Sequence, residues 1–520
     1  MDRSRIAIGL RDSILGKKLL DAGPSIILLG FVFVLAFLME ELFRRVLTSN
    51  SLNLIGVEPN SVFYTERLAM TGHLYTDPHA PPFVVVQYGP LFPYVAWGIH
   101  RTLHVGTSLA SFYLAARLAA CLSVLAIMIG VGAILVRFLR VGPLLAIIAS
   151  LLTGFVMFPW GYVARPDSLY LALLIWAVFA FHRFLVAPSA SGLLPSMALL
   201  LCAGYAKQTG FAFLPLLCIA GLFCLRAAKQ RVVFLLEAGV IVALSAALAP
   251  PHFWQNSAVG LASGIDLRFA IEHMYRPLLL RDSLVIAVWL PCLLLALLGQ
   301  RRWLFPTALL GIYALVLGTA LGVKYGSDIH YYNEYLIFAI ILIAASLPAI
   351  ASAWTRQRTI ALCLASALLC SYVLILVLTQ ARPVLVWSTS RIDDPDLVAI
   401  QRYFATNPSS GLVADLADNG IGVFLPTRIA FAPFDVTGPA AATGHFDLAL
   451  VHKAIRSGTI CYAVTRRIWA TDIREHDRNQ FPWWASPWAA PVLRDLLPQF
   501  EQQAKFGDVV LMRNPVCPTS

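Results

Sequence analysis

The chain has 520 residues, of which 59% are apolar and only 13% are charged, and its mean hydropathy is +0.74. This composition excludes an ordinary soluble domain and an intrinsically disordered chain. The formal net charge is +11, and long apolar runs recur along the sequence, as is typical of transmembrane helices.

The apolar runs predict a polytopic α-helical membrane protein with about eleven transmembrane helices. The first run has no Ala-x-Ala-type exit site and is expected to remain as an uncleaved span. The expected spans are 24–46, 108–136, 143–160, 168–186, 192–206, 209–225, 232–250, 283–299, 303–323, 333–353 and 359–380. The pair 192–206 and 209–225 is short and is also compatible with a re-entrant hairpin.

The basic residues predict the orientation of these spans. With eleven spans, the short loops rich in arginine and lysine face the cytoplasm, as the positive-inside rule requires. A further span at 90–103 would move most of them outside, so this segment is expected to be an interfacial helix in the first external loop. The N-terminus is then cytoplasmic in an inner or plasma membrane, and the external loops are about 47–107, 250–282 and 324–333. Most of the net charge follows from this bias, so membrane lipids, and no nucleic acid, are the expected partners.

The first external loop carries the leading candidate for a general base, Glu58. A carboxylate there can deprotonate the hydroxyl or amine of an acceptor. The alternative is an ordinary loop acid, or a partner for the N-terminus of the helix that begins near Ser61. Glu66 and Asp77 lie in the same loop and are secondary candidates by the same argument.

A second charged motif, Arg165-Pro166-Asp167, lies where the third span emerges and the fourth begins. An ionisable group costs about 2.5–3.5 kcal/mol at the centre of a membrane helix, so charges are kept near its edge. Arg165 and Asp167 placed together indicate a paired site, with Asp167 as the second catalytic candidate. The alternative is a carboxylate that is favoured in the first turn of a helix by the helix dipole.

Several basic residues remain on the external side despite the positive-inside bias. They predict an anionic ligand there, because lysine and arginine bind phosphate through charge-assisted hydrogen bonds; contact with lipid phosphates is the alternative. The candidates for phosphate binding are Arg165, Lys207, Arg268, Arg276 and Lys324. Tyr88, Tyr331, Asn333 and, secondarily, His273 complete the candidate substrate site. The tyrosines also suit an interfacial aromatic belt. No cysteine spacing typical of metal binding occurs, so no metal site is predicted and dependence on a divalent metal stays open.

The sequence changes character after residue 384. Residues 1–384 are expected to form the transmembrane domain, and residues 385–520 a small extracytoplasmic α/β domain. Helices are expected near 395–405, 447–457 and 491–505, and strands near 411–416, 459–465 and 508–513. Cys461 and Cys517 are the only cysteines of this domain. An oxidising compartment would favour a disulfide between them, with two unpaired thiols as the alternative.

This layout resembles the GT-C superfamily of polyprenyl-phosphate-sugar-dependent glycosyltransferases, and within it the branch of protein O-mannosyltransferases and lipid A aminoarabinose transferase. The resemblance extends to about residue 350. It is carried by the loop from Glu58-Pro59-Asn60 to Gln87-Tyr88-Gly89-Pro90-Leu91, by Arg165-Pro166-Asp167, by Ala206-Lys207-Gln208-Thr209-Gly210 and by the segment Asp328–Glu334. One difference is that the family usually has Asp, often Asp-Glu, where this chain has Glu58-Pro59-Asn60.

The resemblance implies an inverting hexosyl- or pentosyltransferase that moves a sugar from a polyprenyl-phosphate donor to an extracytoplasmic glycan, lipid or protein. Glu58 would deprotonate the acceptor, Asp167 would orient it, and the external basic residues would stabilise the leaving phosphate. No cofactor is expected, because a lipid-phosphate leaving group needs no nucleotide site and the chain lacks a glycine-rich phosphate loop.

Two other functions are compatible with the sequence. A transporter or flippase for a lipid-linked substrate predicts charges at mid-span, broken helices and paired halves. Here the polar residues gather in loops and no internal repeat is visible, which favours the enzyme. A ligase or polymerase that moves a whole glycan from a lipid pyrophosphate is not excluded.

Overall fold

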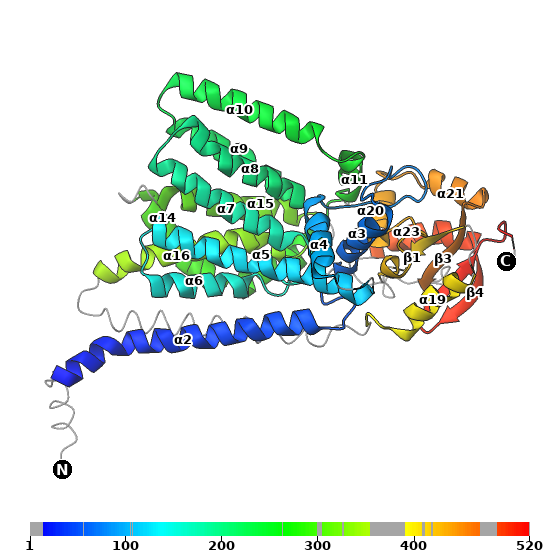
Figure 1. Ribbon diagram of the computed structural model, residues 1–520, viewed down its shortest axis with the longest axis horizontal. Coiled ribbons are helices and arrows are strands. Elements are labelled where there is room, and N and C mark those ends of the chain that lie inside the picture. Colours follow the sequence, from blue (N-terminus) through cyan, green and yellow to red (C-terminus); the bar gives the residue numbers. More distant parts are fainter. Residues whose placement is uncertain are drawn as a thin grey trace, which may run out of the picture.

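The computed structural model describes residues 14–353 and 391–518, apart from residues 56, 105, 107, 263, 299–303, 325–326, 408–410, 418–419 and 468–485. These residues form a bundle of long helices with a smaller, sheet-containing part at one end (Figure 1). The predicted span at 359–380 lies outside the described residues.

A helix lies at each of the other predicted spans. These helices are α2 (Ile14–Thr48), α5 (Leu109–Arg137), α6 (Pro143–Val156), α7 (Asp167–Val186), α8 (Ala190–Ala206), α9 (Thr209–Cys224), α10 (Ala228–Ala247), α14 (Ser283–Leu298), α15 (Phe305–Gly322) and α16 (Asn333–Ala353). Local signals set several of the starts: Ser108 and Ser189 cap α5 and α8 with their side chains, and Pro143 occupies the first turn of α6.

Five described helices are long and apolar enough to cross a membrane, or six if the bent pair Leu267–Arg281 and Ser283–Leu298 forms one span. Three shorter apolar helices accompany them: α6, α8 and α9. Large apolar side chains also point outward from the bundle, among them Phe33, Phe223 and Leu248. Such a surface suits lipid rather than water. The chain is therefore a multi-pass membrane protein, while the count of about eleven spans stays a prediction.

Two shorter helices of the first loop lie at one end of the bundle, which we call the site end. They are α3 (Glu58–Thr71) and α4 (Leu91–Leu103). Helix α4 contacts α3, α5 and α8, and it crosses the ends of the long helices instead of running beside them (Figure 1). The expected helix at 90–103 therefore exists, and its location in a membrane interface stays a prediction.

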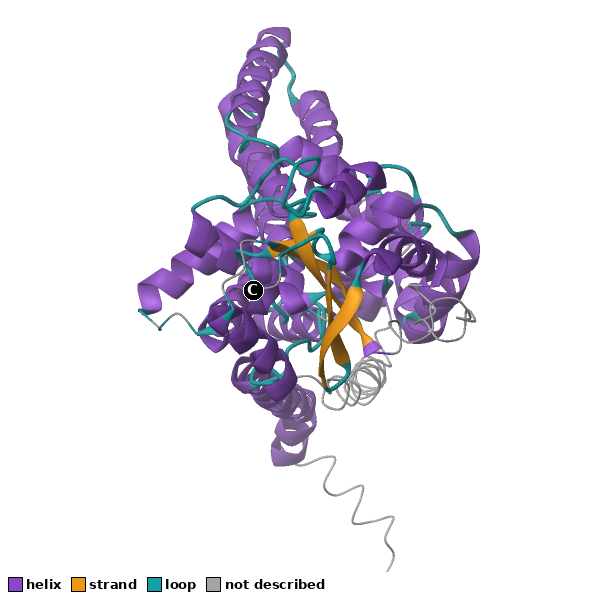
Figure 2. Ribbon diagram, turned by 90° about the vertical axis from the view of Figure 1, so that its right-hand side faces the viewer, coloured by secondary structure: helices purple, strands orange, loops and turns teal. Residues whose placement is uncertain are grey.

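The C-terminal part contains a five-stranded mixed sheet flanked by helices, drawn in orange in Figure 2. The strands are β1 (Leu412–Leu416), β2 (Ile429–Ala430), β3 (Ile460–Arg466), β4 (Glu501–Phe506) and β5 (Val509–Arg513), in the order β2-β1-β3-β5-β4. β1 is parallel to β2 and β3, and β5 is antiparallel to β3 and β4. The helices are α19 (Pro395–Thr406), α20 (Phe434–Ala442), α21 (Leu448–Arg456) and α23 (Ser486–Leu496). This is the small α/β fold that the sequence predicts.

One predicted element is wrong in part. A single helix was expected over 491–505, but α23 ends at Leu496 and β4 occupies Glu501–Phe506. The turn after β4 contains Gly507 with a φ of +53°, which lets the chain reverse in a tight hairpin and pair with β5. β4 is polar and mostly exposed because it lies at the edge of the sheet, so its sequence has no strand-like alternation.

The predicted disulfide between Cys461 and Cys517 is confirmed, with a Cα–Cα distance of 5.6 Å. Cys461 lies in β3, and Cys517 follows β5, the antiparallel neighbour of β3. The bridge therefore ties the chain end to the centre of the sheet.

The C-terminal part packs directly on the first loop. The backbone N–H of Val85 donates to the carbonyl of Ala432 at 2.9 Å, and that of Phe431 donates to Pro82 at 2.9 Å. A shared apolar core joins Phe63 of α3 to Phe424. The first loop thus lies between the bundle and the sheet.

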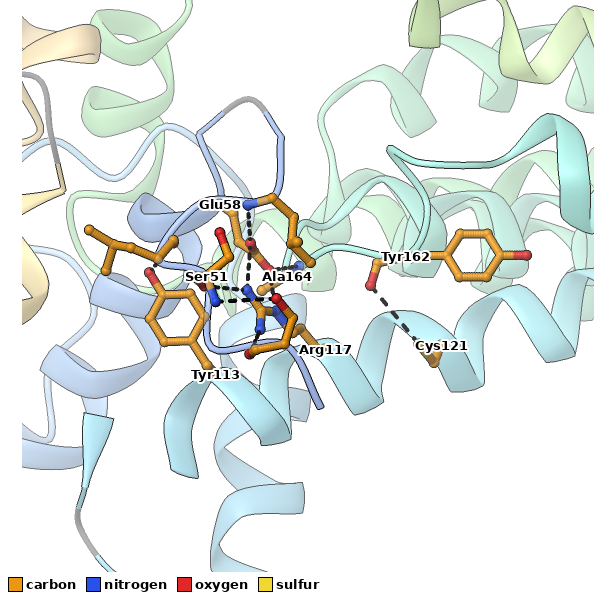
Figure 3. Close-up of polar contacts among 10 residues, drawn as sticks. Ser51, Glu58, Tyr113, Arg117, Cys121, Tyr162 and Ala164 are labelled. Atoms are coloured by element: carbon orange, nitrogen blue, oxygen red, sulfur yellow. Dashed lines mark hydrogen bonds and ion pairs between the residues drawn. The ribbon is translucent and has the colours of Figure 1, made fainter. Parts of the chain in front are cut away.

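A buried ion pair fixes the start of the first loop to the bundle (Figure 3). Glu58, the first residue of α3, is 0% exposed and Arg117 of α5 is 1% exposed. Glu58 Oε1 accepts from Arg117 Nε at 2.8 Å and from the N–H of Ala164 at 3.0 Å. Oε2 accepts from Arg117 Nη2 and from the N–H of Leu54, both at 3.0 Å. Both carboxylate oxygens are therefore occupied.

Arg117 also holds the segment that precedes α3. Its Nη1 donates to the carbonyl of Ser49 at 2.6 Å, and its Nη2 donates to that of Ser51 at 2.7 Å. The hydroxyl of Tyr113, one turn earlier on α5, donates to Leu52 at 2.6 Å. A buried arginine requires such partners, and Arg117 has them here, so it has a structural role.

We expect Glu58→Gln to destabilise the protein by about 3–5 kcal/mol, because it leaves Arg117 as an uncompensated buried charge. Unfolding of the purified protein in mixed detergent micelles measures this. Glu41→Gln is the matched control: Glu41 forms partly exposed pairs with Arg44 and Arg45 near the end of α2, and exposed pairs contribute at most about 1 kcal/mol. Wild-type stability in Glu58→Gln would show that the pair is not structural.

We expect Cys461→Ser to destabilise the sheet by about 4 kcal/mol in the chain-entropy model, less any strain in the native bridge. Cys202→Ser is the control, because Cys202 is an exposed free cysteine of α8. Urea unfolding followed by limited proteolysis of the C-terminal part reports the difference. Alkylation of both Cys461 and Cys517 in protein isolated without reductant would contradict the bridge.

Candidate functional site

A buried cluster of charges lies at the site end of the bundle, centred on Asp167. The carboxylate accepts from Arg165 Nε at 3.0 Å through Oδ2 and from Lys207 Nζ at 2.6 Å through Oδ1. His330 Nε2 lies 3.5 Å from the same Oδ1. All four residues are buried. The structure thus brings the candidate pair Arg165 and Asp167 together with the candidate Lys207, 40 residues away from Asp167, and adds His330, which was not a candidate.

Each member of the cluster lies at the end of a helix. Arg165 precedes α7, and Asp167 is the first residue of that helix, where the helix dipole favours a carboxylate. Lys207 follows α8 in an extended conformation and separates it from α9. His330 lies in the short helix η3 (Ile329–Tyr332), directly before α16. The charges are therefore grouped at helix ends, where the cost of burial in a membrane is lowest.

Aromatic rings surround the two cations. The Arg165 guanidinium carbon lies 4.8 Å from the centre of the Trp160 ring, and Arg165 Nη2 donates to the Tyr88 hydroxyl at 3.1 Å. Lys207 Nζ lies 4.6 Å from the centre of the Tyr331 ring. Cation–π contacts of this kind stabilise partly desolvated charges. Burial raises the pKa of Tyr88 to about 12, so its hydroxyl keeps its proton and can donate to a ligand.

The ion pairs of the cluster join two cations to one carboxylate, and two further acidic residues, Glu334 and Asp328, lie near enough to interact with Lys207 and Arg165 respectively. Arg165 and Lys207 share the single carboxylate of Asp167, and Lys324 lies near enough to be affected by Lys207. Burial and, secondarily, the charge of Lys207 lower the pKa of Lys324 to about 8. Among the described residues, none forms a hydrogen bond or ion pair with the Lys324 ammonium. Lysine and arginine side chains placed in this way can bind an anion through charge-assisted hydrogen bonds.

The loop that carries Tyr88 is fixed tightly against α8 and α11 (Phe253–Gly260). Gln208 Nε2 donates to the carbonyl of Gln87 at 2.8 Å, and the Tyr75 hydroxyl donates to that of Tyr88 at 2.8 Å. At Gly89, a Cβ atom would lie 1.9 Å from the carbonyl oxygen of Tyr205, so any other residue would push the loop away. Packing against Tyr205 therefore requires glycine at position 89, which the sequence Gln87-Tyr88-Gly89 alone does not reveal.

The C-terminal part adds a second carboxylate, Asp435, which sequence reasoning missed. It lies in the first turn of α20 and is partly exposed. Asn60 Nδ2 donates to both of its oxygens, at 3.0 and 2.9 Å. Burial raises the pKa of Asp435 to about 6, opposed by the Asn60 hydrogen bond and by the charge of Arg165. The two partners are 375 residues apart, and the sequence around Asp435 carries no motif that could have revealed it.

Other predicted residues of the first loop lie away from the cluster. Both carboxylate oxygens of Glu58 accept hydrogen bonds from Arg117 and from backbone N–H groups. Glu66 is buried on α3, and burial raises its pKa to about 8. Asp77 accepts the backbone N–H of His79 and closes a loop turn. None of these three contacts Asp167 in the described structure.

The basic candidates of the second loop are not part of the cluster. Arg268 is 87% exposed and pairs with Glu272 of the same short segment, and Arg276 is exposed. His273 packs against the ring of Phe269. Asn333, in contrast, is buried as the first residue of α16, close in sequence to His330 and Tyr331. Among the described residues, no group of three or more histidine, cysteine, aspartate or glutamate side chains is placed to hold a metal ion.

Comparisons with known proteins find a likeness in structure only. Neither protein-family models nor curated protein sequences match this chain. The apo structure of ArnT from Cupriavidus metallidurans matches with a TM-score of 0.51 and 15% identity, over 94% of this chain and 99% of that chain. The structure of the same protein bound to undecaprenyl phosphate matches with a TM-score of 0.52 and 15% identity, over 96% and 100% of the two chains.

An oligosaccharyltransferase from Archaeoglobus fulgidus, tethered with an acceptor peptide, matches with a TM-score of 0.55 and 12% identity, over 91% of this chain and 72% of that chain. ArnT and this oligosaccharyltransferase are both GT-C proteins. The match extends beyond residue 350, because it includes the C-terminal part. The chain therefore has the fold of the GT-C glycosyltransferases, as its sequence layout predicts.

Proposed function

We propose that this protein is an integral-membrane inverting glycosyltransferase that moves a hexosyl or pentosyl group from a polyprenyl phosphate to an acceptor outside the cytoplasm. The observation that carries the proposal is the buried cluster of Lys207, Arg165 and Asp167, which places two cations around one carboxylate at the site end of the bundle. The likeness in fold supports the proposal. One matching structure is ArnT bound to undecaprenyl phosphate, and another is the archaeal oligosaccharyltransferase AglB from Archaeoglobus fulgidus in complex with an inhibitory peptide and a dolichol-phosphate.

In this proposal the cluster binds the phosphate of the donor. Lys207 and Arg165 keep donor hydrogens free beyond their bonds to Asp167, so they can reach phosphate oxygens. As the bond between sugar and phosphate breaks, negative charge grows on the phosphate, and fixed cations in a buried site stabilise that charge. Asp167 holds both cations in place and reduces their mutual repulsion. Tyr88 and Lys324 add further donors at the edge of the site.

We infer that the first loop and the C-terminal part face the extracytoplasmic side and that the N-terminus is cytoplasmic. The disulfide between Cys461 and Cys517 supports this orientation, because structural disulfides persist in oxidising compartments. The acceptor then approaches the site end from the aqueous side. It is a glycan, a lipid or a protein.

The likeness to an oligosaccharyltransferase favours a second candidate, in which the transferred group is an oligosaccharide. The phosphate site and the fold are compatible with either donor. The mass of the transferred group distinguishes the two functions.

Mass spectrometry of lipids and surface glycans, with and without the gene, tests the proposal. Loss of the gene should cause a polyprenyl-phosphate sugar to accumulate and should remove the same sugar mass from a surface molecule. Unchanged lipids and glycans in the strain without the gene would contradict a transferase. A lipid-linked sugar that changes membrane leaflet without being consumed would instead indicate a flippase.

We expect Lys207→Met to weaken binding of undecaprenyl phosphate about 10- to 100-fold, because hydrogen bonds to charged groups contribute about 1.5–3 kcal/mol. Native mass spectrometry or fluorescence titration of the purified protein measures the affinity. Arg268→Gln is the matched control, since Arg268 is exposed and paired within its own loop, and its affinity should change less than about twofold. Equal losses in both variants would argue against a specific site at Lys207.

A further inference from the structure

An inverting transfer to a hydroxyl or amine needs a group that accepts the acceptor's proton. In the described structure, the first loop does not present a free carboxylate beside Arg165 for this purpose. Both oxygens of Glu58 are occupied by Arg117 and by backbone donors. Glu66 is buried, and its pKa of about 8 keeps it mostly protonated near neutral pH.

The N-terminus of α3 separates two environments. Residues two apart on a helix point in nearly opposite directions, so Glu58 and Asn60 face different sides. Glu58 faces Arg117 of the bundle, whereas Asn60 faces Asp435 of the C-terminal part. Tyr64, one turn after Asn60, lies on the same side, and the charge of Asp435 contributes to raising its pKa. Asp435 therefore occupies the face of α3 that is directed away from the structural ion pair.

We propose that Asp435, supplied by the C-terminal part, is the carboxylate that accepts the proton of the attacking acceptor, and that Asn60 positions it. The inference rests on the proposed function and names the base of that same site. It gives the C-terminal part a direct role in the reaction in addition to any role in acceptor recognition.

The backbone around Asp435 is held rigidly against the first loop. Two residues before the start of α20, Ala432 pairs with Val84 and accepts the N–H of Val85. That segment of the first loop continues into Tyr88, which contacts Arg165. The carboxylate and the phosphate-binding cluster are thus connected through one short, well-anchored segment of chain.

The electrostatic setting of Asp435 suits a general base. Arg165, which also pairs with Asp167, lowers the pKa of Asp435, and burial raises it, with a net value of about 6. The charged or titratable groups that interact with Asp435 are Tyr64 from α3 and Arg165 from the segment before α7. Asp415 from β1 lies beside it and accepts the backbone N–H of Phe434. At neutral pH the carboxylate is mostly ionised, and its pKa is close to the operating pH, as an efficient base requires.

The step balances in protons and electrons. The acceptor oxygen or nitrogen forms a bond to the anomeric carbon as its proton passes to the Asp435 carboxylate. The bond between the anomeric carbon and the phosphate oxygen breaks, and its electron pair leaves with the polyprenyl phosphate. Lys207 and Arg165 hold the charge on the leaving phosphate. Asp435 then releases the proton to water.

Azide provides a direct test, because it is an anionic nucleophile that needs no base. The full-length protein is supplied with a panel of undecaprenyl-phosphate hexoses and pentoses. The nucleophile is either a membrane extract from a strain without the gene or sodium azide. Asp435→Asn should lower transfer to the extract about 10²–10⁴-fold. Formation of the glycosyl azide and release of undecaprenyl phosphate should stay within about threefold of the wild-type protein.

The pH dependence gives an independent readout. A group with a pKa of about 6 acts as a base only when it is deprotonated, so wild-type transfer to the extract should fall tenfold per unit as the pH drops below about 6. The azide reaction of Asp435→Asn should lack this decline between pH 5.5 and 7. Asp447→Asn is the control for folding, because Asp447 caps α21 in the same part of the chain, and it should behave as wild type.

The outcomes separate the two proposals. Wild-type transfer to the extract by Asp435→Asn would overturn the role of Asp435 as base. An equal loss with the extract and with azide would also overturn it, because a structural or binding defect affects both nucleophiles. If the wild-type protein released no undecaprenyl phosphate with any donor and either nucleophile, the proposed function would fail, and the inference with it.

Discussion

The buried pair of Glu58 and Arg117 is the interaction on which the arrangement of the site depends. It brings α5, the start of α3 and the segment before α7 to one point, because Glu58 also accepts the N–H of Ala164. Ala164 directly precedes Arg165, so the ion pair that anchors the first loop also places one cation of the cluster. A buried pair is costly to desolvate, and it persists here because each oxygen of the carboxylate has two donors.

The site combines three parts of the chain with different physical roles. The helix ends provide buried charges at a depth where their cost is modest. The first loop provides tyrosines and backbone contacts that close the space around those charges. The C-terminal part provides Asp435, which lies on the opposite side of α3 from the ion pair. The buried cluster and Asp435 thus come from separate elements, and the charge of Arg165 lowers the pKa of Asp435.

This arrangement gives the two polar side chains of Glu58-Pro59-Asn60 different roles. The carboxylate of Glu58 is used for structure, and the position two residues later carries an amide. That amide contacts a carboxylate from another part of the chain. The carboxylate on this side of α3 thus comes from a different element. A local motif cannot reveal such a pair, because the two residues are distant in sequence.

The sequence by itself determined the helical, membrane-embedded character of the chain and the positions of its described apolar helices. Continuous apolar runs satisfy their own backbone hydrogen bonds as helices, so their location depends on local composition. It also identified Arg165, Asp167 and Lys207, because charges that interrupt apolar runs stand out, and it predicted the disulfide from the two cysteines of the C-terminal part. Only the tertiary structure decided which charges meet. Glu58 pairs with Arg117 and Asp435 pairs with Asn60, whereas Arg268 and Arg276 are exposed. Pairing depends on packing between distant segments and not on any local pattern.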